Sequence, residues 1–182
     1  YRARHALLKR PTAVKLLLPE KAGAAAVERF EREVQLTARL THPNTVSIFD
    51  YGRTDDDIYY IAMELLEGKT LHRALREAGP FDIQRALNVA RQICRSLREA
   101  HSLGVIHRDL KPANVYLVKH GDESDFVKVL DFGLVKNLED KGEDLTQTGL
   151  FMGSPKYMSP EQIRGERVDG RAEIYALGVI MY

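Results

Sequence analysis

The feature that most constrains the fold is a change of sequence pattern at Gly68. Before this residue, short apolar runs bounded by polar turns favour strands, and one stretch with apolar residues at helical spacing favours a helix. The predicted strands cover 12–18, 45–51 and 58–65, and the predicted helix covers about 24–40. The first part of the chain is therefore expected to be a small strand-rich lobe with one main helix.

After Gly68 the pattern favours helices. Asp82 is a typical N-cap residue, and an apolar stripe follows it up to Gly104, which predicts a long helix. Cys94 lies on that stripe and is expected to be a packed thiol. A strand pair is predicted at 114–119 and 126–130, and the last residues predict a buried helix. The predicted fold class is α+β, with a strand-rich lobe before a mainly helical one.

The composition argues against several functional classes. Lys and Arg number 27 against 26 Asp and Glu, so the net charge is +1 and no basic face for nucleic acid is expected. The single cysteine excludes a disulfide framework within the chain and a zinc site built from several cysteines. The longest mostly apolar stretch, 172–182, is shorter than the roughly 20 residues that span a bilayer.

Two charged residues interrupt apolar patterns in the first lobe. Lys15 lies within the predicted strand 12–18, and Glu33 lies near the apolar side of the predicted helix. A buried charge is costly unless it is paired, which predicts that these two side chains meet. The alternative is that Lys15 extends along a strand edge and that Glu33 is a rim residue.

A polar segment at 107–114 carries the strongest chemical signal. It reads His-Arg-Asp-Leu-Lys-Pro-Ala-Asn, and the tripeptide Asp131-Phe132-Gly133 follows the second strand of the predicted pair. If the strand pair brings Asn114 and Asp131 together, they offer the oxygen ligands that Mg²⁺ prefers. Asp109 could then accept a proton from a hydroxyl nucleophile, with Lys111 as a cation beside a transferring phosphoryl group.

With these motifs in this order, the sequence resembles the protein kinase family over its full length. The family's signature motifs are matched by Ala13-Val14-Lys15, by 107–114, by Asp131-Phe132-Gly133 and by Ser159-Pro160-Glu161. The resemblance implies a two-lobed kinase fold. Residues 1–67 would be a partial N-lobe with the hinge, and residues 68–182 a partial C-lobe with the catalytic loop and the activation segment.

The resemblance also implies roles for the charged residues. Lys15 would orient the α and β phosphates of ATP and would be held by Glu33. Asp109 would be the catalytic base, supported by Lys111. Asn114 and Asp131 would hold Mg²⁺, with Mn²⁺ as the alternative metal.

An adenine pocket is implied in the same way. Met63 matches the gatekeeper position, and the segment from Glu64 to Leu66 matches the hinge, whose backbone pairs with adenine. Ala13 and Tyr116 match the positions above and below the adenine ring. An aromatic residue at Tyr116 is less usual in the family than a small aliphatic one.

Lys111 and the segment 153–157 are similar to the pattern of serine/threonine kinases, and 157–162 is especially similar to bacterial eukaryotic-like members. In those kinases a Thr-x-Thr pair shortly before the Ser154 position is autophosphorylated, and Thr146 and Thr148 stand there. A phosphate on Thr148 could pair with Arg108 and order the loop. The alternative is that these threonines belong to an ordinary polar loop.

The match departs from the family in two places. The Gly-rich loop that covers the ATP phosphates is absent, and the later helices of the large lobe are missing, so the chain is interpreted as truncated at both ends. Taken alone it is expected to be weakly active or inactive. In addition, Glu173 stands where the family usually has an aspartate that hydrogen-bonds the backbone around Arg108.

The resulting functional hypothesis is a serine/threonine protein kinase that transfers the γ-phosphoryl group of ATP to protein hydroxyls and phosphorylates its own activation loop. Protein substrates and ATP are the expected partners, and dimerisation could serve autophosphorylation. The catalytic part is expected in the cytoplasm, with a membrane tether outside this segment as an option. Two alternatives remain open, a nucleotide-binding pseudokinase scaffold and a small-molecule phosphotransferase.

Overall fold

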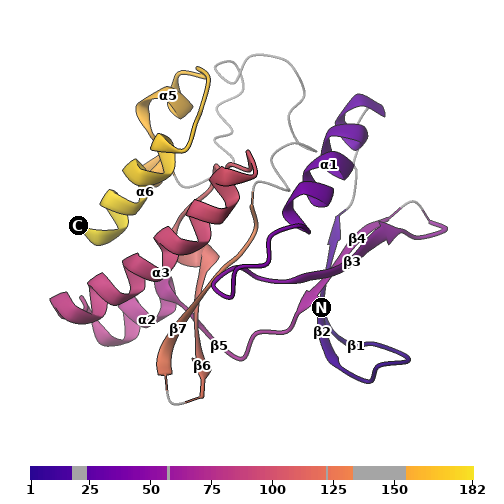
Figure 1. The fold of residues 1–182 in the computed structure, drawn as a ribbon, viewed down its shortest axis with the longest axis horizontal. Coiled ribbons are helices and arrows are strands. Elements are labelled where there is room, and N and C mark those ends of the chain that lie inside the picture. The colour runs from indigo at the N-terminus through magenta and orange to yellow at the C-terminus, as the bar shows by residue number, and fades with distance from the viewer. Residues whose placement is uncertain (18–23, 57, 122, 133–154) are drawn as a thin grey trace.

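The computed structural model of the chain describes residues 1–17, 24–56, 58–121, 123–132 and 155–182. Its elements fall into two groups (Figure 1): four strands with helix α1 on one side, and a smaller sheet with helices α2, α3 and α6 on the other. The protein thus has the α+β, two-part arrangement that the change of pattern at Gly68 predicted.

The first group is a four-stranded antiparallel sheet in the order β1-β2-β4-β3. Its strands are β1 (Arg2–Arg4), β2 (Pro11–Leu17), β3 (Ile48–Arg53) and β4 (Tyr59–Glu64). Strand β4 alternates between buried and partly buried residues, as expected of a central strand with one covered face. Helix α1 (Ala24–Thr37) places Val34 in the same apolar cluster as Ile61 and Met63 of β4.

The second group is built around a three-stranded sheet in the order β5-β6-β7. The strands are β5 (Gly68–Thr70), β6 (Val115–His120) and β7 (Glu123–Val129). Gly68 is required here by space, because a Cβ atom at this position would lie 2.2 Å from the carbonyl oxygen of Leu117 on β6. The change of pattern at Gly68 therefore coincides with a close approach of two strands.

Helices cover this second sheet and contribute most of its core. The helices on the sheet are α2 (Leu71–Ala78) and α3 (Ile83–Ser102), and α6 (Arg171–Met181) packs on α3 (Figure 1). The remaining elements are the short helix α5 (Pro160–Ile163) and 3₁₀ turns at Pro112–Asn114 and Pro155–Tyr157. Thr70 and Asp82 cap α2 and α3 by accepting the backbone N–H groups of Arg73 and Arg85. Ile93 and Leu97 of α3 are buried in one cluster with Val127 of β7. The part of the chain that the structure describes contains no helix long and apolar enough to cross a membrane.

The turn after α1 ties the two groups together. Its Asn44 carbonyl accepts the N–H of Val129, and the Val46 N–H donates to the Val129 carbonyl at 2.9 Å. The Asn44 side chain also donates to Gln92 of α3 at 3.0 Å. The Glu99 carboxylate, at the end of α3, accepts backbone N–H groups of the same turn. Residues of the first group are therefore fixed to the second close to the point where β7 ends.

The observed bounds of two elements differ from the predicted ones, and a backbone contact explains each difference. Helix α1 ends at Thr37 rather than near residue 40, since Leu40 N–H closes a turn onto the Thr37 carbonyl. Strand β3 begins at Ile48 rather than 45, because Thr45 forms a parallel bridge with Val129 of the other group. The resemblance to the kinase family also implied a strand within residues 1–5, and β1 confirms it, whereas the short elements β5, α2 and α5 have no counterpart among the sequence-based predictions.

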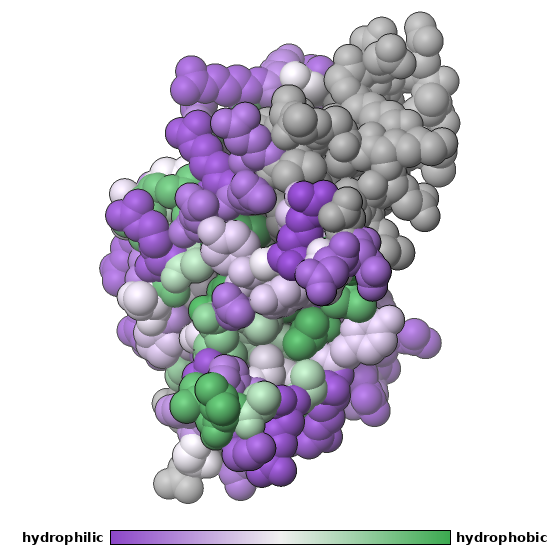
Figure 2. Space-filling view, turned by 90° about the vertical axis from the view of Figure 1, so that its right-hand side faces the viewer, coloured by the Kyte–Doolittle hydropathy of each residue, from purple (hydrophilic) through white to green (hydrophobic). Residues whose placement is uncertain are grey.

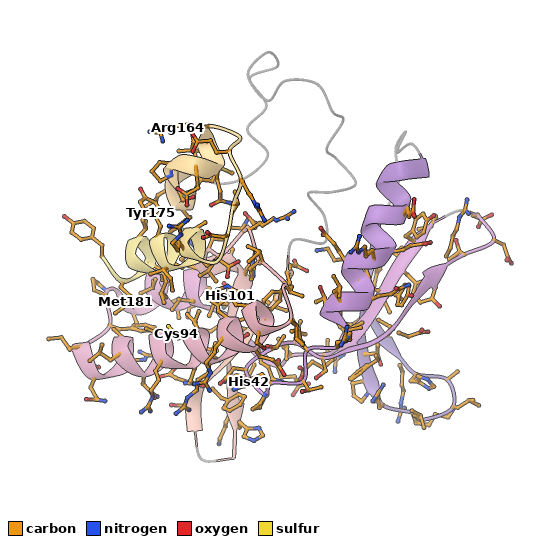
Figure 3. The ribbon with its side chains drawn as sticks, turned by 45° about the horizontal axis from the view of Figure 1, so that its top comes forward. His42, Cys94, His101, Arg164, Tyr175 and Met181 are labelled. Carbon is orange, nitrogen blue, oxygen red and sulfur yellow. The ribbon has the colours of Figure 1, made fainter. Side chains whose placement is uncertain are left out.

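Two predictions of burial were wrong. Cys94, which Figure 3 labels on α3, was expected to be packed but is exposed, because the buried face of this helix passes through Ile93 and Leu97. Helix α6 was expected to be buried, but Tyr175 and Met181 are exposed while its other face is covered.

The face of the molecule in Figure 2 carries mostly hydrophilic residues with smaller apolar patches among them.

Candidate active site

His107 anchors the segment 107–114 in the core. Its Nε2 donates to the Leu130 carbonyl at 2.7 Å, and its Nδ1 accepts the backbone N–H of Asp109 at 3.2 Å. The ring lies against Phe132, with the two centroids 4.7 Å apart. Burial lowers the pKa of His107, which favours the neutral imidazole that these hydrogen bonds require. His107 therefore fixes the residue that follows Arg108 in the loop.

Asp109 lies in a cluster of polar groups. Lys111 places its Nζ 2.7 Å from Asp109 Oδ2. Asn114 donates from Nδ2 to the Asp109 carbonyl at 2.8 Å and to its Oδ2 at 3.1 Å. The structure thus brings together the predicted base, cation and amide, and it orients the Asp109 carboxylate from two sides.

The predicted metal ligands lie at the ends of paired strands. Asn114 directly precedes β6 and Asp131 follows β7, and the Leu130 N–H donates to the Asn114 carbonyl at 2.9 Å. Because the side-chain nitrogen of Asn114 donates to Asp109, its side-chain oxygen is the atom left to accept or to ligate. An amide oxygen and a carboxylate suit Mg²⁺, which is usually held by one or two carboxylates plus substrate phosphates. This donor set therefore fits the metal that the resemblance implies.

The structure gives Lys15 and Glu33 each a contact with a different charged residue. Within the part of the chain that the structure describes, Lys15 Nζ contacts Asp131 Oδ1 at 2.9 Å, and Glu33 Oε1 contacts Arg108 Nη1 at 3.7 Å. Each of these two contacts joins a residue of the first group of elements to a residue of the second.

The predicted adenine-contacting residues come from both sheets. Ala13 of β2 pairs in register with Met63 of β4, and Tyr116 lies on β6 opposite Lys128 of β7. Glu64, at the end of β4, accepts the Ser47 N–H at 2.8 Å and the Lys128 Nζ at 2.7 Å. These contacts fix the start of the predicted hinge.

Leu66, two positions further along the hinge, is a partly buried residue packed on the core of the first group. Thr146, Thr148 and Ser154, the predicted regulatory residues, lie outside the described residues.

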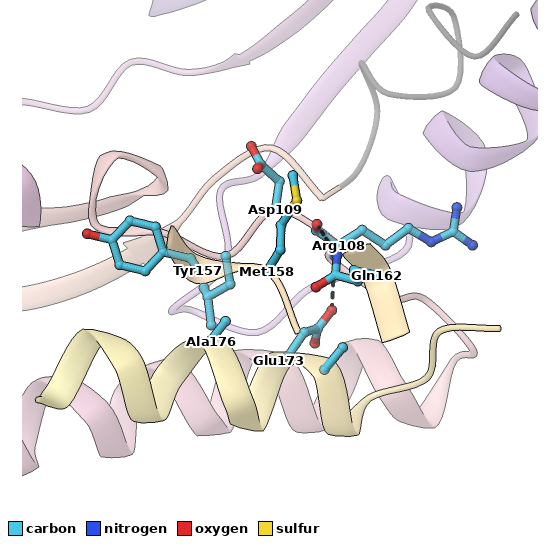
Figure 4. A pocket seen from close by; sticks show the side chains of 9 residues that line it. Arg108, Asp109, Tyr157, Met158, Gln162, Glu173 and Ala176 are labelled. Atoms are coloured by element: carbon cyan, nitrogen blue, oxygen red, sulfur yellow. Dashed lines mark hydrogen bonds between the residues drawn. The ribbon is translucent and has the colours of Figure 1, made fainter. Parts of the chain in front are cut away.

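Glu173 lies beneath the loop and is 2% exposed. Its Oε1 accepts the backbone N–H of His107 and that of Arg108, the latter at 3.2 Å, and its Oε2 is hydrogen-bonded to Nε2 of His101. Figure 4 shows Glu173 pointing from α6 to the loop below Asp109. The extra methylene of this glutamate is therefore accommodated without loss of the backbone contacts that the family's aspartate makes.

Two residues of this site were missed from the sequence. Gln162 of α5 donates from Nε2 to the Arg108 carbonyl at 2.8 Å, and His101 contacts Glu173 from the end of α3. A cavity of about 10 Å³ lies beside Gln162 and is also lined by Asp109 and Met158 among others; this is roughly the room for one water molecule. No sequence signal marked either residue, because both contacts join segments far apart in the chain.

Comparison with known proteins agrees with this geometry. A family profile described as "Protein kinase domain" matches residues 1–182. The chain is 42% identical over 185 residues to the serine/threonine-protein kinase pkn3 of Myxococcus xanthus, covering 100% of this chain and 34% of that protein. It is 40% identical over 184 residues to the serine/threonine-protein kinase PknB of Mycolicibacterium smegmatis, covering 99% of this chain and 29% of that protein. The chain belongs to the protein kinase family.

These relatives also indicate which class of protein kinases the chain is similar to. It is similar to bacterial proteins named serine/threonine-protein kinases, including PknB of Mycobacterium tuberculosis at 39% identity over 184 residues. This alignment covers 99% of the present chain and 29% of that relative. The chain therefore spans only about a third of the length of these curated proteins. The family resemblance, the α+β fold and the two-lobed arrangement are thereby confirmed.

Proposed function

We propose that the protein containing this chain is a serine/threonine protein kinase that transfers the γ-phosphoryl group of ATP to protein hydroxyls. The observation that carries the proposal is the cluster of Asp109, Lys111 and Asn114, with Asp131 at the end of the neighbouring strand. It combines a base, a cation and hard oxygen ligands in one place, as phosphoryl transfer requires.

The reaction assigns one task to each of these residues. The substrate hydroxyl oxygen bonds to the γ-phosphorus, its proton passes to the Asp109 carboxylate, and the bond from phosphorus to the β–γ bridging oxygen breaks, so that ADP leaves. Lys111 stabilises negative charge on the transferring group, and Lys15 orients the α and β phosphates. Asn114 and Asp131 would hold Mg²⁺ or Mn²⁺, which supplies neutralisation of the phosphate charge when bound.

Regulation by phosphorylation is part of the proposal. The Arg108 side chain is 44% exposed and its guanidinium contacts Glu33, so it offers a cation on the catalytic loop. A phosphate on Thr148 would bring a charge of about −2 and would compete with the Glu33 carboxylate for that cation. We expect one copy of the protein to phosphorylate Thr146 and Thr148 of a second copy. Ser154 lies in the same segment and is assigned to the same regulation. The proposed location of the catalytic part is the cytoplasm, because ATP is available there.

The test uses the full-length protein with radiolabelled ATP and Mg²⁺, a general protein acceptor, and an Asp109→Asn variant as the control. Label on the acceptor and on Thr146 or Thr148 is expected, and both labels should vanish in the control. Binding of ATP without transfer by the unmodified protein would contradict the proposal and support a scaffold. Transfer to small alcohols but not to protein would support a small-molecule phosphotransferase.

A further inference from the structure

Glu173 divides the two oxygens of its carboxylate between the catalytic loop and helix α3. Oε1 accepts the N–H groups of His107 and Arg108, and Oε2 contacts Nε2 of His101 in the last turn of α3. A carboxylate that is 2% exposed needs such partners, because a buried charge without hydrogen bonds is strongly destabilising. His101 therefore satisfies the oxygen that the loop does not use.

Gly170 is fitted to the His101 ring. Its φ of −59° and ψ of −15° are ordinary helical values that any residue adopts, so its backbone does not require glycine. A Cβ atom at residue 170 would, however, lie 2.7 Å from Cε1 and 2.8 Å from Nδ1 of His101. The requirement for glycine is therefore one of space for the imidazole. Gly178 on the same helix has nothing within 4 Å of its would-be Cβ atom.

The backbone of the loop needs an external hold at this point. Arg108 has a φ of +63°, a conformation that is uncommon for residues other than glycine and costs free energy. Its N–H donates to Glu173 and its carbonyl accepts Gln162 Nε2, so both faces of this strained unit are held. Asp109 is the next residue, and its direction depends on the peptide units that Glu173 holds.

We propose that Glu173, His101 and Gly170 form one positioning unit for the catalytic loop, in which His101 acts on Asp109 through Glu173. A glutamate has one more rotatable bond than the aspartate usual in the family, and its carboxylate is fixed only if its second oxygen is also held. His101 supplies that hold, and Gly170 supplies the space for the His101 ring. This inference rests on the proposed kinase function, because the loop matters only if Asp109 is the base.

The first test compares His101→Ala with His101→Gln in the full-length protein. For each variant, kcat is calculated per molecule that binds nucleotide, so that misfolded protein does not lower the value. His101→Ala is expected to lower kcat about tenfold, with the KM for ATP changed by less than about twofold, because the loop and not the adenine pocket is disturbed. His101→Gln should restore most of kcat, since its amide N–H can reach Glu173. His72→Ala, an exposed histidine on α2, is the matched control and should leave kcat unchanged.

The second test isolates the space requirement. Gly170→Ala is expected to lower kcat and the melting temperature, whereas Gly178→Ala on the same helix should lower neither. In a His101→Ala background the ring is gone, so adding Gly170→Ala should cause no further loss in either measurement. This readout keeps the inference testable even where the single variant folds poorly.

The outcomes separate this inference from the proposed function. No transfer by the unmodified protein would overturn the proposed function and this inference with it. Transfer by the unmodified protein with an unchanged kcat in His101→Ala would overturn this inference alone. So would a lower melting temperature in His101→Ala without any change in kcat, since that result describes packing rather than positioning.

Discussion

Lys15 and Asp131 form an ion pair between the two groups of elements, with Nζ 2.9 Å from Oδ1. Lys15 is predicted to orient ATP phosphates and Asp131 to hold the metal, so the ion pair joins two residues that are assigned to the same nucleotide site. The side chains are 30% and 35% exposed, which limits the strength of the pair through solvent screening. The contact brings the two functional groups together, but it is weak enough to be exchanged.

A Lys15→Met variant separates function from stability at this pair. We expect phosphoryl transfer to fall by about 100-fold or more, because a preorganised cation is lost from the phosphate site. The free energy of unfolding should fall by less than about 1 kcal/mol, since a partly exposed ion pair contributes little. Transfer assays and urea unfolding of the same preparation give both values.

The matched control is Lys69→Met, which removes another lysine in an ion pair, 3.0 Å from Glu77. It should show the same small change in stability with no change in transfer. A loss of several kcal/mol in Lys15→Met would show that the ion pair is a main structural contact and would contradict this account.

Glu33 offers a second test, because it contacts Arg108 and is predicted to hold Lys15. If Glu33 holds Lys15 during transfer, Glu33→Gln should add no further loss of kcat to Lys15→Met, although it lowers kcat alone. In unfolding experiments the coupling between Glu33 and Arg108 should stay below about 1 kcal/mol, as expected of a partly exposed pair at 3.7 Å. Additive losses of kcat would mean that Glu33 acts independently of Lys15.

The sequence predicted which residues converge, but not which atoms meet. Motif spacing along paired strands predicted that Asn114 and Asp131 would be brought together, because a hairpin fixes the relation of its two ends. The partner of Lys15 depends instead on where α1 lies relative to the sheet, and short-range pattern contains no information on that. The contact between His101 and Glu173 joins α3 to α6, and a contact of such separation leaves no periodic signal.

Two buried threonines make a matched pair for stability. The hydroxyl of Thr37 is buried and has no hydrogen-bond partner in the described part of the chain. The buried hydroxyl of Thr45 is hydrogen-bonded to Ser96 at 2.7 Å. We expect Thr37→Val to stabilise the protein by about 1 kcal/mol, because an unsatisfied buried polar group is replaced by a methyl group of similar size.

Thr45→Val should have the opposite sign and destabilise by about 1 kcal/mol or more, since it leaves Ser96 without its partner. Urea unfolding of the two variants beside the unmodified protein measures both changes. Equal signs for the two substitutions would contradict the distinction drawn from their hydrogen bonds.

Histidine burial predicts how stability depends on pH. Burial lowers the pKa of His107, so between that value and the ordinary pKa of about 6.5 the unfolded chain binds more protons than the folded one. The free energy of unfolding is therefore at its full value with respect to His107 above about pH 6.5, and it decreases as the pH falls toward the pKa of His107 in the folded protein. The slope from this one group is at most about 1.4 kcal/mol per pH unit.

Unfolding in urea from pH 8 to pH 5 measures this slope, and His107→Gln should make it shallower while its amide can still donate to Leu130. Burial also lowers the pKa of His42, helped by the charges of Arg98 and Arg95 and opposed by that of Glu99, so a smaller slope of the same sign should remain. His72→Gln, at an exposed position, should reproduce the slope of the unmodified protein. If His107→Gln leaves the slope unchanged, another group carries the pH dependence, and the neutral His107 is not what acid disrupts.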